Sequence, residues 1–246
     1  MKFSKLPRIY TTQRIEKKQI IVIEQDNFHY LKSVIRIRKF HTFRLFNSYD
    51  GEFEVTVQDI NSNNVKIQVG VLLRKVQKET DLELAVCIIK PNRMLDAIKS
   101  AVQLGVTRII PVISQRTQYK KLSRNRIQKC IIQSVQQCER FYIPILEPEL
   151  TFSDFCNKFQ SRQIIIACEF AKENNTIINI HKIEDKFIVL IGPEGGFSTQ
   201  EIAQINSLNY TRCISLGQTV LRTEVAVSYA LAFIKIVASD KVLFQK

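Results

Sequence analysis

Short, continuous apolar runs are the feature that most restricts the fold of this chain of 246 residues. Isoleucine, valine and leucine dominate residues 83–90 (ELAVCIIK), 106–113 (VTRIIPVI), 162–170 (RQIIIACEF) and 186–192 (KFIVLIG). Strands of a parallel sheet have this composition because they are buried on both faces. We therefore predict an α/β fold with a mostly parallel sheet.

Stretches with helical periodicity separate these runs. Apolar residues recur on one helical face in residues 93–105, and again in residues 123–140. Ser198 and Glu201 have the spacing of a capping box, which predicts a helix that begins after Ser198. A long apolar helix is expected from about Thr223. Strands that alternate with helices in this way are typical of α/β proteins.

The first seventy residues have a different pattern. Residues 43–60 and 64–73 are rich in Ile, Val and Phe, are broken by turn formers, and therefore predict strands. A short helix is expected after an Asp26 cap. We predict two domains: a small β-barrel over residues 1–73, a form that often binds nucleic acid, and the α/β domain over residues 74–246.

The charge of the chain is strongly basic. The 36 basic and 23 acidic residues give a formal net charge of +13. An excess of this size favours a polyanionic partner, either nucleic acid or an anionic membrane surface. The alternative is an ordinary solvated, lysine-rich surface.

Targeting, membrane and metal signals are missing. The chain turns polar directly after its basic start, and its longest apolar stretch, residues 225–239, is too short for a span and contains Lys235. The six cysteines form no CxxC pair and the three histidines no ligand cluster, so no metal is expected. Reduced cysteines within apolar patterns indicate a cytoplasmic protein.

A glycine-rich loop follows the predicted strand at residues 186–192. Three of the seven glycines lie within residues 192–196, in IGPEGGFS. Ligands of open α/β sheets bind beyond the carboxyl ends of strands, and glycine lets the backbone approach a ligand closely. A tight strand-to-helix turn is the alternative. The phosphate-loop patterns GxxxxGK[ST] and GxGxxG are both absent.

A second candidate loop is SLGQTVLRTEVA, residues 215–226. A predicted strand ends at Gly217, and Arg222 and Glu224 lie where the next helix begins. A glutamate at this position suits the helix dipole, whereas an arginine does not, which indicates another use for Arg222. A structural role for both residues is the alternative.

Basic residues cluster in residues 115–145. This segment contains seven basic side chains and a single acidic one, Glu139. Two of them, Arg124 and Arg126, open a predicted helix, where positive charge is least favourable. RNA phosphates would explain this placement, and a solvated basic loop is the alternative. The candidate RNA contacts here are Arg116, Lys120, Lys121, Arg124, Arg126, Lys129 and Arg140. In the N-terminal domain they are Arg8, Arg36, Arg38, Lys39 and Arg44, with Tyr10 and His29 for stacking.

Taken together, IGPEGGFSxxEI and LGxxxLRxEVA resemble the SPOUT methyltransferases of the RsmE type, which methylate N3 of a uridine in 16S ribosomal RNA. PRIY, HYLKSVIRI, LFNSYDGEF, QLGV, IIPVISQRT and QQCER occur in the order of that family, so the resemblance covers nearly the whole chain. The chain departs from the family at four places: Gln218-Thr219 replace Pro-Arg, Gln103 replaces Glu, Glu139 replaces Gly, and Val225 replaces Thr.

The resemblance implies a trefoil knot in the α/β domain, a PUA-like N-terminal barrel, a homodimer, and 16S ribosomal RNA or the 30S subunit as partner. It also implies S-adenosylmethionine (SAM) as cofactor, held by the two loops. The implied binding residues are Ile191, Gly192, Pro193, Glu194, Gly195, Gly196, Leu216, Gly217, Val220, Leu221 and Ala226.

Three residues are catalytic candidates. Our hypothesis is that Arg222 stabilises the ionising uracil, and that Glu224 or Glu194 orients the base or accepts its proton. Two alternatives stay open at this point. One is a SPOUT methyltransferase that acts on another RNA position, and the other is a ribosome-binding factor without activity.

Overall fold

The computed structural model describes residues 6–168 and 186–243. Contacts divide the chain into two compact units. Unit 1 runs to Lys78 and also contains residues 135–143, and unit 2 contains the remainder. Unit 1 thus extends beyond the boundary expected at residue 73. The addition of residues 135–143 has no counterpart in the local sequence pattern.

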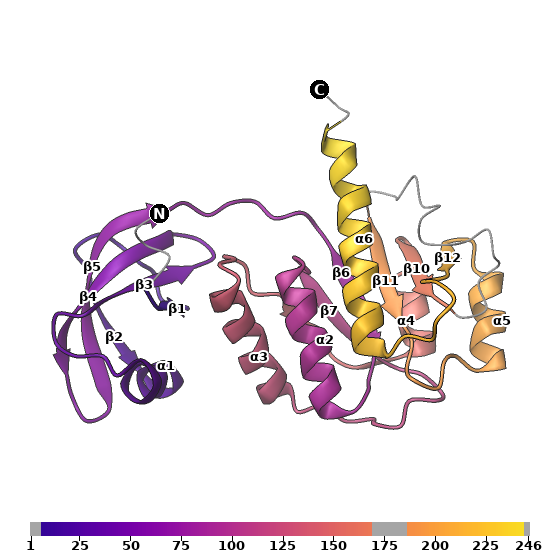
Figure 1. The fold of residues 1–246 in the computed structure, drawn as a ribbon, viewed down its shortest axis with the longest axis horizontal. Coiled ribbons are helices and arrows are strands. Elements are labelled where there is room, and N and C mark those ends of the chain that lie inside the picture. Colours follow the sequence, from indigo (N-terminus) through magenta and orange to yellow (C-terminus); the bar gives the residue numbers. More distant parts are fainter. Residues whose placement is uncertain (1–5, 169–185, 244–246) are drawn as a thin grey trace. The chain divides into compact units, whose positions relative to one another are not determined.

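Unit 1 is built on a five-stranded sheet in the order β1-β3-β4-β5-β2 (Figure 1). The β1–β3 pair is parallel, and the other neighbours are antiparallel. Fully buried aliphatic residues such as Leu45, Val55 and Ile67 form its core. The strands are β1 (Arg8–Tyr10), β2 (Ile20–Glu24), β3 (Thr42–Asn47), β4 (Gly51–Ile60) and β5 (Asn64–Arg74).

The helix of unit 1 begins one residue before the expected cap. α1 (Gln25–His29) continues into a π-helix, η1 (Tyr30–Ile35). Glu24 occupies the N-cap position without a side-chain hydrogen bond, and Asp26 lies in the first turn. The expected Asp26 cap is therefore wrong, although the helix itself is present.

Unit 2 contains a parallel sheet in the order β12-β10-β11-β6-β7-β8, with the short β9 also paired to β7. Every pair is parallel, which confirms the predicted α/β class. The strands are β6 (Glu83–Cys87), β7 (Arg108–Ile113), β8 (Ile145–Leu146), β9 (Leu150–Thr151), β10 (Gln163–Ala167), β11 (Phe187–Ile191) and β12 (Thr211–Ile214).

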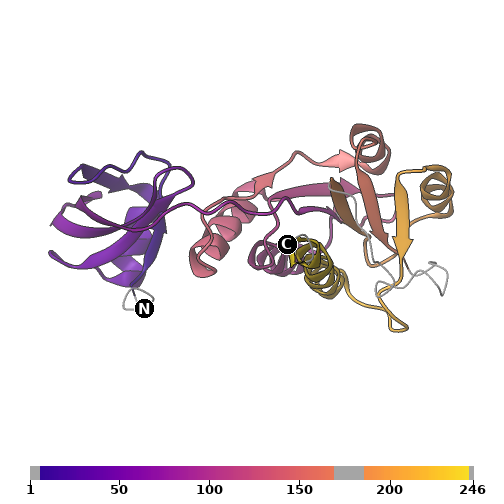
Figure 2. The same ribbon diagram turned by 90° about the horizontal axis from the view of Figure 1, so that it is seen from above.

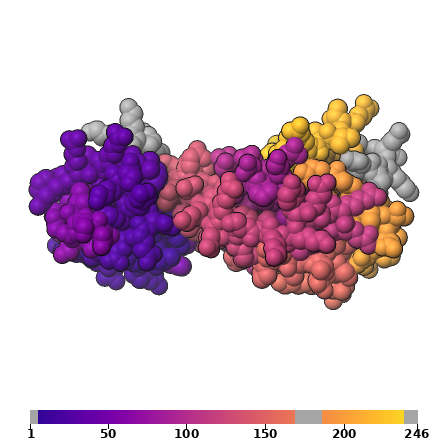
Figure 3. All heavy atoms as spheres, turned by 90° about the horizontal axis from the view of Figure 1, so that it is seen from below, coloured from indigo at the N-terminus to yellow at the C-terminus, as the bar shows by residue number. Residues whose placement is uncertain are grey.

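Helices cover both faces of this sheet (Figure 2). α4 and α5 pack on one face, where Phe152, Phe155 and Ile205 share a core with the strands. α2 and α6 lie together on the other face, and their atoms adjoin on the surface in Figure 3. The helices are α2 (Pro91–Gln103), α3 (Arg124–Gln137), α4 (Phe152–Lys158), α5 (Thr199–Ser207) and α6 (Thr223–Leu243).

The helix starts agree with the local signals. The Ser198 side chain accepts from the Glu201 amide, and the Glu201 carboxylate accepts from the Ser198 amide, so the predicted capping box is confirmed.

In the part of the chain that the structure describes, no helix is long and apolar enough to cross a membrane, and this includes α6.

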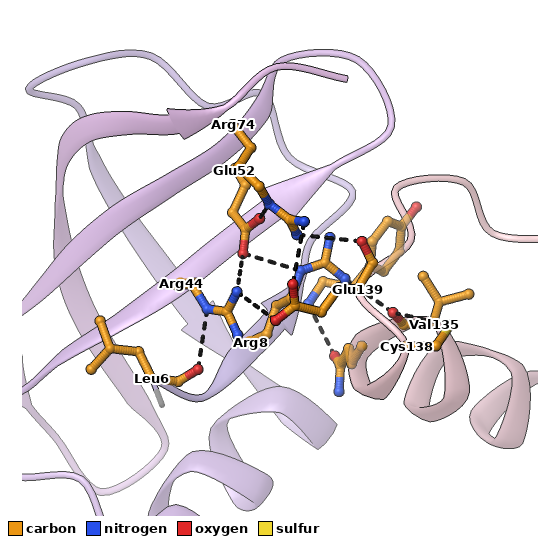
Figure 4. A network of polar contacts seen from close by, with 10 residues as sticks. Leu6, Arg8, Arg44, Glu52, Arg74, Val135, Cys138 and Glu139 are labelled. Atoms are coloured by element: carbon orange, nitrogen blue, oxygen red, sulfur yellow. Dashed lines mark hydrogen bonds and ion pairs between the residues drawn. The ribbon is translucent and has the colours of Figure 1, made fainter. Parts of the chain in front are cut away.

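A buried ion cluster lies inside unit 1 (Figure 4). Glu52 is fully buried and pairs with three arginines. Its Oε1 lies 3.1 Å from both Arg8 Nε and Arg44 Nη1, and its Oε2 pairs with Arg74 Nε. Glu139 pairs with two of these arginines, at 2.9 Å from Arg44 Nη1 and 3.3 Å from Arg74 Nη1. We call these five residues the Glu52 cluster.

Glu139 explains why residues 135–143 belong to unit 1. Its backbone φ is +61°, in the left-handed region that favours glycine. The family resemblance implies a glycine at this position, and this chain has a glutamate whose carboxylate joins the Glu52 cluster. Arg8 Nη1 also donates to the Val135 carbonyl at 3.0 Å. The segment is thus held on the sheet by charge-assisted hydrogen bonds.

Glu139→Gln is expected to lower the melting temperature at neutral pH, because three guanidinium groups would then share one carboxylate. Burial by itself raises the pKa of Glu139. The hydrogen bond from Arg44 and the charges of Arg44 and Arg74 outweigh burial, so that the pKa lies below its ordinary value of 4.5. A carboxylate whose pKa is lower in the folded than in the unfolded state stabilises the fold at a pH above its unfolded-state pKa. This stabilisation is lost as the pH falls through the folded-state pKa.

The difference in melting temperature between wild type and Glu139→Gln is therefore expected to shrink below about pH 4.5. Thermal unfolding followed by circular dichroism from pH 3 to pH 7 measures it. Glu149→Gln, which removes the 3.4 Å ion pair with Arg124 in unit 2, is the control. A constant difference across this range would show that the ion pairs of Glu139 contribute nothing.

Candidate functional site

One pocket lies at the carboxyl ends of three neighbouring strands of unit 2. The order β12-β10-β11 puts the ends of these strands side by side, and the loops after β11 and β12 leave from them (Figure 1). The pocket has a volume of 380 Å³. Its position agrees with the general rule for ligand sites in open α/β sheets.

The structure brings all eleven expected cofactor residues together in the lining of this pocket, eight from residues 191–217 and three from residues 220–226. Ile191, Pro193 and Ala226 are buried, whereas Glu194, Gly195, Gly217 and Val220 are exposed. A further eight lining residues were not among the eleven expected ones. They come from the two loops themselves, from residues 167–168, from α5 and from Arg116. These are Arg116, Ala167, Cys168, Phe197, Ile202, Ser215, Thr219 and Thr223.

Hydrogen bonds fix the two loops to each other and to the rest of unit 2. Thr223 Oγ1 donates to the Gly192 carbonyl at 3.1 Å, which joins the start of α6 to the loop after β11. Arg116 Nη1 donates to the Gly195 carbonyl at 3.0 Å. The loop itself closes by a bond from the Gly196 amide to the Pro193 carbonyl, 2.9 Å long. These bonds hold the two loops in a single arrangement around the pocket.

Glu201 anchors a third loop beside the pocket. Its Oε1 accepts from the Gln115 amide at 2.8 Å, and its Oε2 accepts from the Ser198 amide at 2.8 Å. The side chain is buried, so these charge-assisted bonds are shielded from water. Glu201 thus positions Arg116, which follows Gln115 directly, as well as capping α5.

An arginine that the sequence did not indicate links two of the catalytic candidates. Arg93, in the first turn of α2, lies 3.2 Å from Glu194 Oε1 through its Nη1 and 3.9 Å from Glu224 Oε1 through its Nε. Its position could have signalled a function, because an arginine in the first turn opposes the helix dipole. The same reasoning had singled out Arg222.

The three catalytic candidates differ in their surroundings. Glu194 lies in the pocket lining, while Glu224 and Arg222 do not. Glu224 Oε2 is buried and has no hydrogen-bond partner among the described residues. Arg222 is exposed, and its carbonyl accepts from the Val225 and Ala226 amides in the first turn of α6. A buried carboxylate oxygen without a donor has the capacity to accept a proton.

The expected RNA contacts divide by exposure. Arg8 and Arg44 lie in the interior of unit 1, where they serve the Glu52 cluster, so the expectation that they contact phosphate is corrected. Burial lowers the pKa of Arg8 to about 10, and its guanidinium carbon lies 3.4 Å from the centre of the Phe46 ring. The exposed candidates are His29, Arg36, Arg38, Lys39, Arg116, Lys120, Lys121, Arg126 and Lys129, and the partly buried ones are Tyr10, Arg124 and Arg140.

Arg124 has a structural explanation for its place at the start of α3. It donates to the carbonyls of Leu146 at 2.9 Å and of Glu147 at 2.8 Å. The carboxylate of Glu149 lies 3.4 Å away. Arg124 therefore connects α3 to β8 and to the residues that follow it, which explains its position without an RNA contact.

The fold and the pocket define the class of this protein. Residues 76–235 match the family model of an RNA methyltransferase domain. Among solved structures, a methyltransferase from Legionella pneumophila in complex with SAM is 25% identical, with a TM-score of 0.81 and coverage of 96% of this chain and 98% of that one. A ribosomal RNA small subunit methyltransferase E from Neisseria gonorrhoeae has the same TM-score at 22% identity, with coverage of 94% and 98%.

Sequence relatives make the assignment more specific. A ribosomal RNA small subunit methyltransferase E from Rickettsia conorii is 36% identical over 96% of this chain and 97% of its own length. One from Buchnera aphidicola is 27% identical over 96% of this chain and 98% of its own. The chain belongs to the family of ribosomal RNA small subunit methyltransferase E.

Proposed function

We propose that this protein transfers the methyl group of SAM to N3 of a uridine in 16S ribosomal RNA. The observation that carries the proposal is the pocket, in which all eleven residues of the two family loops meet. A relative of the same fold, 25% identical, holds SAM. Relatives of nearly the same length are named as methyltransferases of small-subunit ribosomal RNA.

The residues of the pocket fit this cofactor. Ile191, Leu216 and Ala226 offer apolar surface for an adenine ring, and the loop backbones offer amides and carbonyls. Arg116, held at Gly195, offers a cation for a carboxylate. When bound, SAM supplies an electrophilic methyl group on a sulfonium.

The chain itself has to bind the uracil and remove a proton from N3. We assign the proton acceptor to Glu224, because its Oε2 is buried and lacks a donor among the described residues. Arg93 orients Glu224 and Glu194 through its two ion pairs. The exposed Arg222 stabilises the developing negative charge on the uracil. Orientation and electrostatics together then lower the barrier.

The remaining assignments follow from the family. We propose that unit 1 is the PUA-like barrel that docks on the RNA, that the loops of unit 2 form a trefoil knot, and that two chains form a homodimer. The mostly antiparallel sheet of unit 1 supports the first assignment, and the late position of the pocket loops in the chain supports the second. We also propose a cytoplasmic location, because a ribosomal RNA or 30S substrate is found there.

Nucleoside mass spectrometry tests the proposed function. 16S ribosomal RNA from cells that lack the protein is expected to have lost one N3-methyluridine, and the wild-type gene is expected to restore it. Loss of a different methylated nucleoside would reassign the position. An unchanged set of nucleosides, together with no SAM binding by calorimetry, would contradict enzymatic activity.

Replacing Lys120 and Lys121 with alanine is expected to weaken RNA binding and to reduce its salt dependence. Both lysines are exposed in the loop that follows Arg116. Each phosphate contact contributes about 0.7–0.9 to the slope of log K against log salt, so the slope should fall by about 1.5. Fluorescence anisotropy with a 16S fragment from 50 to 300 mM KCl measures it. Lys158→Ala, an exposed lysine of α4, is the control, and an equal slope in all three proteins would contradict a role for the loop.

A further inference from the structure

Two cysteine thiols lie in contact at the edge of the SAM pocket. Cys168 directly follows β10, and Cys213 lies in β12, the neighbouring strand at the edge of the sheet. Their sulfur atoms are 3.0 Å apart. Cys168 is buried and lines the pocket, whereas Cys213 is partly exposed. The pair therefore connects the surface to the pocket wall.

The two thiols have different reactivities. The hydrogen bond from Cys168 lowers the pKa of Cys213, although burial opposes this effect. That hydrogen bond, followed by burial, raises the pKa of Cys168. Burial raises the pKa of Cys87 to about 12 and that of Cys156 to about 11. Since the thiolate is the nucleophile, Cys213 is the cysteine of the pair that reacts first.

We propose that Cys168 and Cys213 form a redox-sensitive pair that a peroxide converts into a reversible disulfide between β10 and β12. The Cys213 thiolate attacks one peroxide oxygen, the O–O bond breaks, and a sulfenic acid and hydroxide result. The Cys168 sulfur then displaces the hydroxyl group, and the S–S bond forms. The two thiols lose two electrons and two protons, and hydrogen peroxide is reduced to two molecules of water.

The position of Cys168 gives this bond a consequence for the pocket, which rests on the proposed function. The Cys168 amide donates to the Ile214 carbonyl at 2.9 Å, directly before the loop that begins at Ser215. A disulfide requires a sulfur separation of about 2.05 Å, so the strand ends must adjust. We expect the oxidised protein to bind SAM at least about threefold more weakly.

Peptide mapping tests the disulfide without reference to SAM. The full-length protein is treated with hydrogen peroxide, alkylated and digested. A Cys168–Cys213 cross-link that dithiothreitol removes is expected, and it should be absent from Cys213→Ser and from Cys168→Ser. Cys138→Ser, which removes the partly exposed cysteine of unit 1, should retain it. Absence of the cross-link in peroxide-treated wild type, or a disulfide that joins Cys168 to a different cysteine there, would overturn the proposal.

Calorimetric titration with SAM tests the consequence. Reduced and peroxide-treated wild type are compared, with re-reduced protein as a third sample. Weaker binding after oxidation that reduction restores supports a pocket-linked switch, and equal affinities would overturn it. Failure of the reduced protein to bind SAM would contradict the proposed function instead, while the mapping would still decide the thiol pair.

Discussion

Gly217→Ala is expected to weaken SAM binding about tenfold. Gly217 has a φ of +124°, which L side chains rarely adopt, and an added Cβ would meet no atom within 4 Å. The effect therefore comes from the backbone alone, and such strain costs about 1–3 kcal/mol. The free loop of the variant relaxes to another conformation, and ligand binding has to restore the strained one. Isothermal titration calorimetry with SAM measures the change.

Gly105→Ala is the matched control for this prediction. Gly105 has a φ of +100° and lies at the end of α2 in the same unit, outside the lining of the pocket. It should lower the melting temperature to a similar degree while leaving the affinity for SAM within about twofold. Equal affinities in wild type and Gly217→Ala would show that the conformation of this loop is not needed for binding.

Arg93→Ala is expected to lower the single-turnover methylation rate about a hundredfold while SAM affinity changes little. Without Arg93, Glu194 and Glu224 lose the cation that holds them, and a displaced acceptor reacts far more slowly. Arg93→Lys should recover part of the rate, because a lysine keeps the charge but has a different geometry. Quench-flow or rapid filter assays with SAM-saturated enzyme measure the rate.

Lys99→Ala is the control on the same helix, since Lys99 makes only an exposed ion pair with Asp96 in the described contacts. Its rate should match wild type. A normal rate for Arg93→Ala would remove Arg93 from the mechanism. Arg222→Ala belongs in the same series, and a near-normal rate there would withdraw the proposed role of Arg222 at the uracil.

Local patterns predicted those features that depend on neighbouring residues in the chain. The apolar runs predicted the parallel strands because burial on both faces leaves no room for polar residues. Ser198 and Glu201 predicted the start of α5, because a capping box is complete within four residues. The two pocket loops were identified from their sequence motifs. Each motif directly follows a strand in the sequence, so its place at a strand end does not depend on the order of the strands in the sheet.

Tertiary structure alone decided which charges are buried and which residues share the pocket. Arg8 and Arg44 read as surface cations in the sequence, but Glu52, more than forty residues away from Arg8, holds both in the interior. Arg93 and Glu194 are 101 residues apart, and Cys168 and Cys213 are 45 apart. Their pairing depends on strand order and helix packing, which follow from the lowest free energy of the whole domain and leave no periodic signal in any one segment.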